Sequence, residues 1–163
     1  MAKRYVVTGG PCGGKSTTLS CLERMGYYAT PEATRIALKN KIPMRNLYKV
    51  RLELEGAIPT FAEVAFLDRG FPDSLAFLRF QNLEIPEKMR ELCRTDRYDG
   101  VFLFDMLPVY VKDEYRVYSR EQSEELHKLI EEAYIGCGYF LVRVPVMLAE
   151  ERAKFILESI GER

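Results

Sequence analysis

The stretch GGPCGGKS, residues Gly9 to Ser16, follows directly after the short apolar run Tyr5 to Thr8. It matches the pattern G-x-x-x-x-G-K-[ST], in which Lys15 is the lysine. Residues at helical spacing follow the motif: Thr18, Leu19, Leu22 and Met25. A strand before the glycines and a helix after them are the setting that this motif requires, so we interpret it as a phosphate-binding loop, the P-loop.

The chemistry of this loop predicts a bound Mg-ATP. Glycines let backbone N–H groups turn onto phosphate oxygens, and the following helix adds unpaired N–H groups and the positive end of its dipole. Lys15 would contact the β- and γ-phosphates, and the Ser16 hydroxyl would bind Mg²⁺, which prefers oxygen ligands. The nucleotide contacts predicted from the loop are Gly9, Gly10, Pro11, Cys12, Gly13, Gly14, Lys15, Ser16 and Thr17.

Outside the loop, apolar runs alternate with helical patterns, which is typical of a parallel sheet with helical crossovers. We therefore expect an α/β fold with three layers, formed by a single domain over residues 1–163. The predicted strands are Tyr5–Thr8, Tyr27–Ala29, Glu63–Leu67, Val101–Phe104 and Tyr139–Val144.

Two helices are indicated by their ends. Ser119 and Gln122 have the spacing of a capping box, and apolar residues at helical spacing follow them. A second helix begins near Ala149 and ends at Gly161. The segment from Lys39 to Pro59 carries basic residues among apolar ones and is interrupted by prolines, so its structure stays open.

Composition limits the classes of partner. The chain has 163 residues, 47% of them hydrophobic, and its 24 Lys and Arg residues balance its 24 Asp and Glu residues. Such a balance gives none of the excess positive charge that is typical of proteins that bind nucleic acid or an anionic membrane. No apolar run reaches the length of a signal peptide or membrane span, so we expect a cytoplasmic, soluble protein with small-molecule partners and an unspecified oligomeric state. The four cysteines lack metal-site spacing, and we interpret them as free thiols.

Two carboxylates are candidates for the magnesium site, because two apolar runs end in an aspartate. These are VAFLD, ending at Asp68, and VFLFD, ending at Asp105. In open parallel sheets, ligands bind beyond the carboxyl ends of the strands, so both positions qualify. Asp68 is favoured because Arg69 and Gly70 follow it, which places a cation and a flexible backbone where a phosphate or an acceptor would lie. The single histidine, His127, lies just off the apolar stripe of its helix and is expected to be a solvated side chain without a chemical role.

Five segments together resemble the AAA-domain, ribosylnicotinamide-kinase-like group of P-loop ATPases and kinases. They are the P-loop, PEATR at Pro31–Arg35, FLDRG at Phe66–Gly70, KDEYR at Lys112–Arg116 and VRVP at Val142–Pro145. The resemblance implies a nucleoside- or nucleotide-kinase-like fold with strand order 2-3-1-4-5 and a lid after the fourth strand. Some members of the group are described as GTP-binding, and the resemblance does not name the acceptor.

The resemblance also assigns roles to individual residues. Asp68 would act near Mg²⁺ or the acceptor hydroxyl, and Arg69 would contact a phosphate or the acceptor. Arg116 and Arg120 match lid arginines that reach the transferred phosphate or stack on the base, although each could equally be a solvated surface residue. Glu32 and Arg35 would face the acceptor, but their spacing also suits a plain surface ion pair. Pro145, after the last strand, would border the adenine.

The sequence therefore favours a kinase that transfers the γ-phosphoryl group of ATP to a small nucleoside-like or other hydroxyl acceptor. The alternative is a nucleotide-gated ATPase or GTPase whose bound state is detected by a partner. Guanine-specific proteins usually carry N-K-x-D, whereas Asn40-Lys41 is followed here by Ile42-Pro43, which favours adenine weakly. A ring-forming mechanical ATPase is disfavoured, since the chain has no room for a separate helical lid domain.

Overall fold

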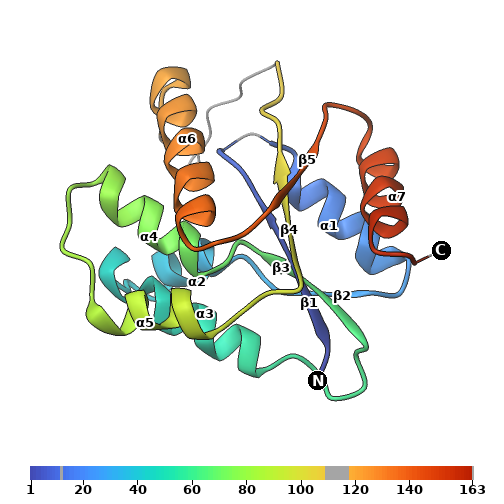
Figure 1. Cartoon of the computed structure of the whole chain (residues 1–163), viewed down its shortest axis with the longest axis horizontal. Coiled ribbons are helices and arrows are strands. Elements are labelled where there is room, and N and C mark those ends of the chain that lie inside the picture. Colours follow the sequence, from blue (N-terminus) through green and yellow to red (C-terminus); the bar gives the residue numbers. More distant parts are fainter. Residues whose placement is uncertain (12, 109–117, 163) are drawn as a thin grey trace.

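A parallel five-stranded sheet forms the centre of the molecule (Figure 1). The structure is a computed structural model that describes residues 1–11, 13–108 and 118–162. The strands stand in the order β2-β3-β1-β4-β5, as the resemblance implied. Their bounds are β1 Lys3–Thr8, β2 Tyr28–Ala29, β3 Val64–Asp68, β4 Gly100–Phe104 and β5 Leu141–Val144. Each predicted strand is confirmed, with ends that shift by one or two residues.

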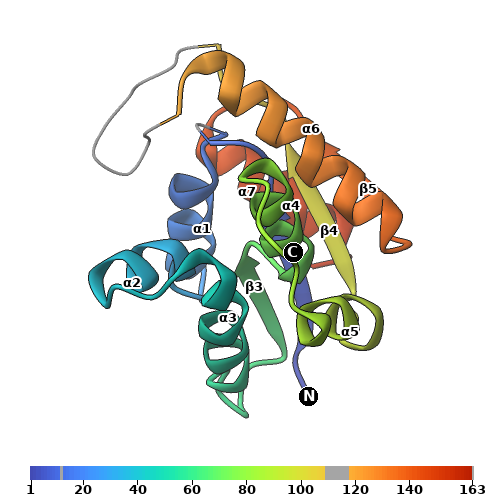
Figure 2. The same cartoon turned by 90° about the vertical axis from the view of Figure 1, so that its left-hand side faces the viewer.

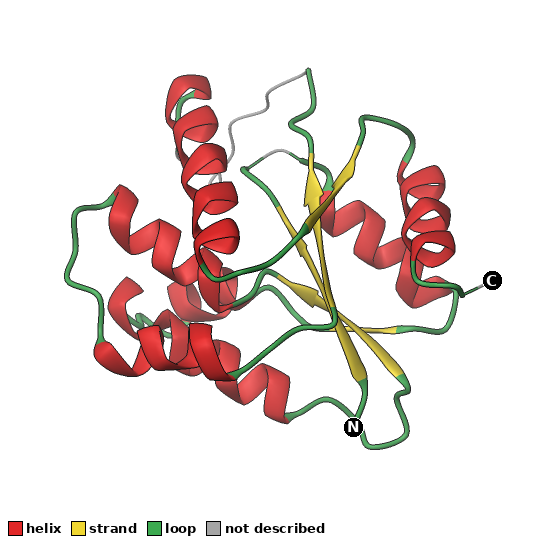
Figure 3. Cartoon of the chain, in the orientation of Figure 1, coloured by secondary structure: helices red, strands yellow, loops and turns green. Residues whose placement is uncertain are grey.

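Helices cover both faces of the sheet, which gives the three expected layers (Figures 1 and 3). Helices α1 (Lys15–Arg24) and α7 (Ala149–Ser159) lie on one face. On the other face lie α2 (Ala33–Lys39), α3 (Leu47–Gly56), α4 (Phe71–Phe80), α5 (Glu87–Thr95) and α6 (Arg120–Gly136). In Figure 2, α6 runs along the side of the molecule that faces the viewer, close to α4 and β4.

The alternation of side chains along the strands divides the core into two clusters. Val6, Leu67 and Leu103 pack with α4, α5 and α6. Phe66 and Phe102, on the opposite face, pack with α1 and α7. Every residue of β3 is buried, which agrees with its nearly continuous apolar sequence.

The segment left open by the sequence is mostly helical. A 3₁₀ turn, η1 (Met44–Asn46), follows Pro43, and α3 begins directly after it. Pro43 disfavours continuation of α2, because the residue before a proline avoids the helical region. Leu47 and Val50 of α3 pack against Ala33 and Ala37 of α2 in a third, smaller cluster.

The capping box predicted at Ser119 is present. The Gln122 N–H donates to Ser119 Oγ at 3.1 Å, and the Ser119 N–H donates to Gln122 Oε1 at 2.8 Å. Cys21, Cys93 and Cys137 are free thiols as expected. The expected lid segment at Lys112–Arg116 and the loop residue Cys12 lie outside the described residues. Within the parts of the chain that the structure describes, no helix is long and apolar enough to cross a membrane.

Strand register brings the P-loop and Asp68 to the same edge of the sheet. Val7 of β1 pairs with Asp68 of β3, and Thr8 pairs with Leu103 of β4. The loop that begins at Gly9 therefore starts beside the carboxyl end of β3. This is the edge at which ligands bind in open parallel sheets.

Candidate functional site

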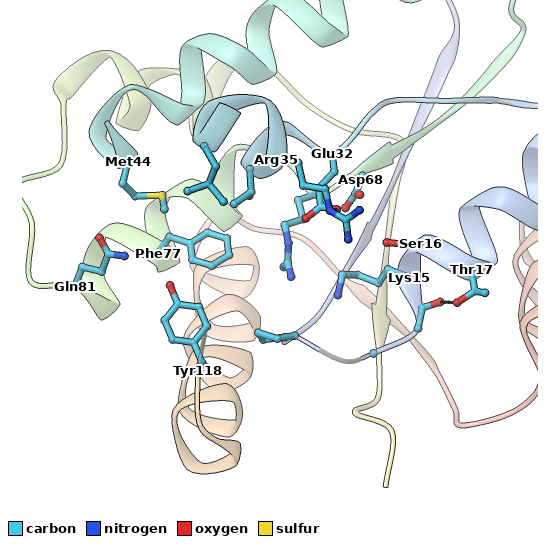
Figure 4. A pocket seen from close by; sticks show the side chains of 16 residues that line it. Lys15, Ser16, Thr17, Glu32, Arg35, Met44, Asp68, Phe77, Gln81 and Tyr118 are labelled. Atoms are coloured by element: carbon cyan, nitrogen blue, oxygen red, sulfur yellow. Dashed lines mark hydrogen bonds and ion pairs between the residues drawn. The ribbon is translucent and has the colours of Figure 1, made fainter. Parts of the chain in front are cut away.

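A pocket of about 330 Å³ opens at this edge and extends from the P-loop to helices α2 and α4 (Figure 4). Its P-loop end carries Lys15, Ser16 and Thr17, and Asp68 and Arg69 lie beside them. Its other end is mainly apolar and is lined by Leu38, Met44, Phe77, Gln81 and Tyr118. Figure 4 shows the charged group on one side and the apolar group, with the Gln81 amide, on the other.

The second half of the P-loop is held by a helix far away in sequence. Gly14 adopts a left-handed conformation, with φ of 77°, immediately before α1 begins at Lys15. A Cβ atom at Gly14 would lie 2.5 Å from the guanidinium nitrogens of Arg152. Arg152, buried on α7, donates from Nη1 to the Gly13 carbonyl at 2.6 Å. Glycine at position 14 thus allows both the turn and the close approach of this arginine.

Lys15 is buried at the base of the loop, where its Nζ donates to the Gly10 carbonyl at 2.9 Å. Burial, with a further contribution from the charge of Arg69, lowers the pKa of Lys15 to about 7. Desolvation disfavours the ammonium form, and a nearby anion favours it. A phosphate group bound in the loop would therefore restore the positive charge of Lys15.

Of the two aspartates considered for the metal, Asp68 lies in the pocket. Its backbone N–H donates to Thr30 Oγ1 at 2.9 Å, and its side chain faces the region of Ser16 and Lys15 (Figure 4). Asp105 instead forms an ion pair with Arg143 of β5 at 3.9 Å and does not line this pocket. A carboxylate and a hydroxyl on the same side of a phosphate site fit the oxygen ligands that Mg²⁺ prefers.

Arg69 bridges the P-loop and helix α4 in a strained conformation. Its φ of 68° is unusual for a residue other than glycine, and such strain is often found at functional sites. Its Nη1 donates to the Gly9 carbonyl at 2.7 Å and to Asp73 Oδ1 at 3.0 Å. Its guanidinium also lies 5.2 Å from the centre of the Phe77 ring. The side chain that lines the pocket is thus fixed from several directions.

Asp73 is a site residue that the sequence analysis missed. It is fully buried in α4, and its carboxylate accepts hydrogen bonds from Thr8 Oγ1 at 2.5 Å, the Gly70 N–H at 2.9 Å and the Tyr134 hydroxyl. Although burial opposes ionisation, the charges of Arg69 and Arg51 and the hydrogen bonds from Thr8 and Tyr134 lower the pKa of Asp73. The only sequence signal was its position in the first turn of a helix, which also suits an ordinary capping residue.

Glu32 and Arg35, the predicted acceptor residues, both line the pocket. Arg35 Nε and Glu32 Oε2 form an ion pair at 2.9 Å, one turn apart around the start of α2. This contact is compatible with both interpretations of the sequence, an acceptor site and a plain surface ion pair. The pair lies between the P-loop end of the pocket and its apolar end (Figure 4).

Four further predicted residues lie outside this pocket or outside the described residues. Arg120 donates from Nη1 to the Pro108 carbonyl at 3.1 Å and pairs with Glu124 at 3.2 Å on its own helix. Pro145 is exposed in the loop after β5. Arg116 lies outside the described residues, as does Cys12 of the loop. The structure therefore brings together the P-loop, Glu32, Arg35, Asp68 and Arg69, and does not bring Arg120 or Pro145 to them.

The expectation that His127 is a solvated side chain was wrong. His127 is half-buried, and its Nδ1 accepts a hydrogen bond from the Gly10 N–H at 2.8 Å. Arg51 of α3 was also missed: it is buried, and it donates to the Asp68 carbonyl at 3.2 Å and to Ser74 Oγ at 2.9 Å. These contacts join residues far apart in the chain, so periodicity along the sequence carries no signal for them.

Comparison with solved structures shows the same fold in P-loop kinases. NadR protein in complex with NR superposes with a TM-score of 0.81 at 14% identity, over 99% of this chain and 52% of that one. A thymidylate kinase from Candida albicans gives 0.67 at 14% identity, over 98% and 91%. A deoxyadenosine kinase from M. mycoides, with dCMP and dCDP bound, gives 0.60 at 16% identity, over 97% and 98%. The chain spans about half the length of the NadR chains.

No curated protein sequence matches the chain closely enough to count as a relative. The AAA domain family, in contrast, matches residues 4–152, which is most of the chain and includes the P-loop, Asp68 and Arg69. With a parallel sheet in the order 2-3-1-4-5 and a P-loop after its central strand, this protein belongs to the AAA domain family and has the fold of the P-loop nucleoside and nucleotide kinases.

Proposed function

We propose that this protein is a kinase that transfers the γ-phosphoryl group of Mg-ATP to a hydroxyl group of a small, nucleoside-like acceptor. The observation that carries the proposal is the continuity of the pocket. One cavity joins the P-loop, where the phosphates would lie, to an apolar end lined by Phe77 and Tyr118, which suits a ring-shaped acceptor. The Arg69 guanidinium reaches from the Gly9 carbonyl of the P-loop to the Phe77 ring at the apolar end, where a phosphoryl group would cross.

Each charged residue has a part in this proposal that follows from its position. The loop N–H groups and Lys15 would hold the β- and γ-phosphates, and the buried setting strengthens these interactions. Ser16 and Asp68 would hold Mg²⁺, which when bound offsets the negative charge of the phosphates. Arg69, fixed by Asp73 and the Gly9 carbonyl, would donate to the transferred group without having to reorganise.

On the acceptor side, Glu32 would accept a hydrogen bond from the acceptor hydroxyl, and Arg35 would orient Glu32 through their ion pair. The NadR structure with NR and the deoxyadenosine kinase structure with dCMP and dCDP support an acceptor of this class. The family and the fold are shared by proteins with several acceptors, so the acceptor must be found by assay.

The test is transfer of the labelled γ-phosphate of ATP to a panel of nucleosides, nucleoside monophosphates and ribosylnicotinamide. Arg69→Ala is expected to lower the rate of transfer by about 100-fold or more, the effect of removing one preorganised donor, while ATP binding survives. Asp68→Asn is expected to weaken the dependence on Mg²⁺. Arg79→Ala is the matched control, since Arg79 is an exposed arginine at the far end of α4.

A nucleotide-gated switch is the second candidate, because it would share the P-loop and the magnesium residues. It predicts a different result in the same assay. Phosphate would pass to water alone across the whole panel, and Arg69→Ala would hydrolyse ATP as the wild type does. That outcome would contradict the kinase proposal.

A further inference from the structure

Helix α6 contacts the two ends of the phosphate site, although it contributes no residue of the motif itself. Near its middle, His127 accepts the hydrogen bond from the Gly10 N–H of the P-loop. Near its end, the Tyr134 hydroxyl donates to Asp73, the carboxylate that fixes Arg69. The helix is therefore in contact both with the loop that would hold the phosphates and with the carboxylate that fixes Arg69, the arginine that would donate to the transferred group.

The contact at Gly10 depends on a very close approach of helix and loop. A Cβ atom at Gly10 would lie 2.9 Å from the Cβ of His127 and 3.0 Å from the Ser123 carbonyl oxygen. Glycine at this position lets the loop backbone reach the helix surface. The imidazole then supplies an acceptor for a buried N–H group, which would otherwise be left without one at a cost in free energy.

Only one form of the imidazole can make this hydrogen bond. The Gly10 N–H is the donor at 2.8 Å, so Nδ1 must be unprotonated and the proton must be on Nε2. In the imidazolium form both nitrogens carry hydrogen, and Nδ1 would face the Gly10 N–H with a second donor.

We propose that His127 is a positioning residue of the phosphate loop: by accepting the Gly10 hydrogen at Nδ1 it holds the first half of the loop in its phosphate-binding shape, and protonation of the imidazole releases that hold. This proposal rests on the proposed nucleotide site. It assigns His127 no contact with the nucleotide and no part in the transfer of the phosphoryl group. The consequence is that the loop loses nucleotide affinity in mild acid.

The charged groups around His127 come from four elements. Burial is the largest influence and lowers the pKa of His127, and Lys15 and Arg143 act in the same direction. Glu131 of the same helix and Asp105 after β4 oppose them. Arg143 of β5 forms ion pairs with both of these carboxylates, which weakens their raising effect on the pKa of His127.

Two variants separate the hydrogen bond from mere packing. His127→Asn retains an acceptor oxygen near the place of Nδ1 and does not titrate, whereas His127→Leu fills similar space without an acceptor. Lys128→Asn, at the exposed neighbouring position, is the control. Melting temperatures measured for all four proteins show whether each variant is folded.

The first measurement is the dissociation constant of ADP at pH 7.0 and pH 5.0. At pH 7.0 we expect His127→Leu to bind about tenfold more weakly than the wild type, the scale of one buried donor left without its acceptor, and His127→Asn to bind nearly as the wild type does. Between pH 7.0 and 5.0 the wild type should lose more affinity than His127→Asn. Protonation of ADP affects both proteins alike and cancels in this comparison, and protonation of Lys15, which favours phosphate binding, opposes the expected loss.

The second measurement is an NMR titration of the free protein, made simple because His127 is the chain's only histidine. The Gly10 amide signal should change with the same midpoint as the imidazole, and that change should be absent in His127→Asn. Equal ADP affinity of His127→Leu and the wild type would overturn the proposal. So would a Gly10 amide signal that does not change when the imidazole titrates. If the wild type binds no nucleotide, the proposed function fails, and the NMR titration still decides whether His127 holds the loop.

Discussion

At the scale of single residues, the site combines ionisable groups whose burial shifts their charge. Lys15 is the clearest case, because its pKa of about 7 lies far below that of a solvated lysine. Asp73 shows the opposite balance, since the charges of Arg69 and Arg51, with the hydroxyl donors Thr8 and Tyr134, lower its pKa in spite of burial. Each shift leads to a measurable expectation.

Lys15 predicts that nucleotide binding takes up a proton above pH 7. The free lysine is largely neutral there, whereas bound phosphates favour its ammonium form, so affinity should fall as pH rises from 7 to 9. Calorimetry of ADP binding in buffers with different ionisation enthalpies measures the uptake. We expect it to be larger at pH 8.5 than at pH 6 in the wild type, and the difference to vanish in Lys15→Met. An uptake independent of pH would contradict the shifted pKa.

Asp73 predicts a large loss of stability when its charge is removed. Asp73→Asn would leave Arg69 without its buried carboxylate and convert an acceptor of several hydrogen bonds into a partial donor. We expect the free energy of unfolding to fall by about 3 to 5 kcal/mol, as for other broken buried ion pairs. Urea denaturation measures this. Asp105→Asn, which weakens only the partly exposed pair with Arg143, should cost less than about 1 kcal/mol; equal losses in the two variants would refute the role given to Asp73.

The residues of the motif were predictable because their spacing is local. Lys15 and Ser16 belong to the P-loop motif, and Asp68 ends an apolar strand, so the local sequence displays both patterns. His127 and Arg152 were not predictable, since their partners Gly10 and Gly13 are 117 and 139 positions away. Their contacts arise only when the two helices pack beside the loop.

At the scale of elements, the stability of helix α6 depends on the contacts of its first turn. Ser119 caps it, and the same turn is tied to the chain after β4 through Arg120 and the Pro108 carbonyl. Helix α6 also carries His127 and Tyr134, which contact Gly10 and Asp73. Unwinding of its first turn would therefore weaken these two contacts. The strength of the cap is therefore worth measuring.

Ser119→Ala is expected to lower the free energy of unfolding by about 1 kcal/mol, the usual effect of removing an N-cap side chain. The loss follows from the hydrogen bond between the Gln122 N–H and Ser119 Oγ. Thermal or urea unfolding measures it. Ser159→Ala is the control, because that hydroxyl bonds only to the carbonyl of Phe155 within its own helix. A loss no greater than that of the control would show that the cap contributes nothing.

Among the elements, those with strong patterns were predicted well and the mixed one was not. The apolar strands and the capped helix α6 match the sequence closely. Residues 39–59 failed to give a clear pattern, because α3 buries a basic side chain among apolar ones, with Arg51 turned inward to the Asp68 carbonyl. Burial of an arginine reverses the rule that charged residues mark the solvent face of a helix.

At the scale of the whole molecule, occupancy of the proposed nucleotide site should raise global stability. Any ligand that binds only the folded state stabilises it, by about 2.7 kcal/mol at 100 times the dissociation constant. For a chain of this length we expect Mg-ATP to raise the melting temperature by about 5 to 10 °C. Lys15→Ala should shrink the shift. A melting curve unmoved by millimolar Mg-ATP and Mg-GTP would contradict the nucleotide site altogether.

The hydrogen bond from Arg152 to the Gly13 carbonyl also has a consequence for folding during synthesis. The P-loop leaves the ribosome before α7, because Arg152 follows Gly13 by 139 positions. At about 5 to 20 residues per second, translation of that interval takes roughly 7 to 28 seconds. During this time the glycine-rich turn exists without the arginine that fills the space beside it. A nascent chain therefore cannot acquire the finished loop until α7 has emerged and docked, so the loop is completed well after its own residues are made.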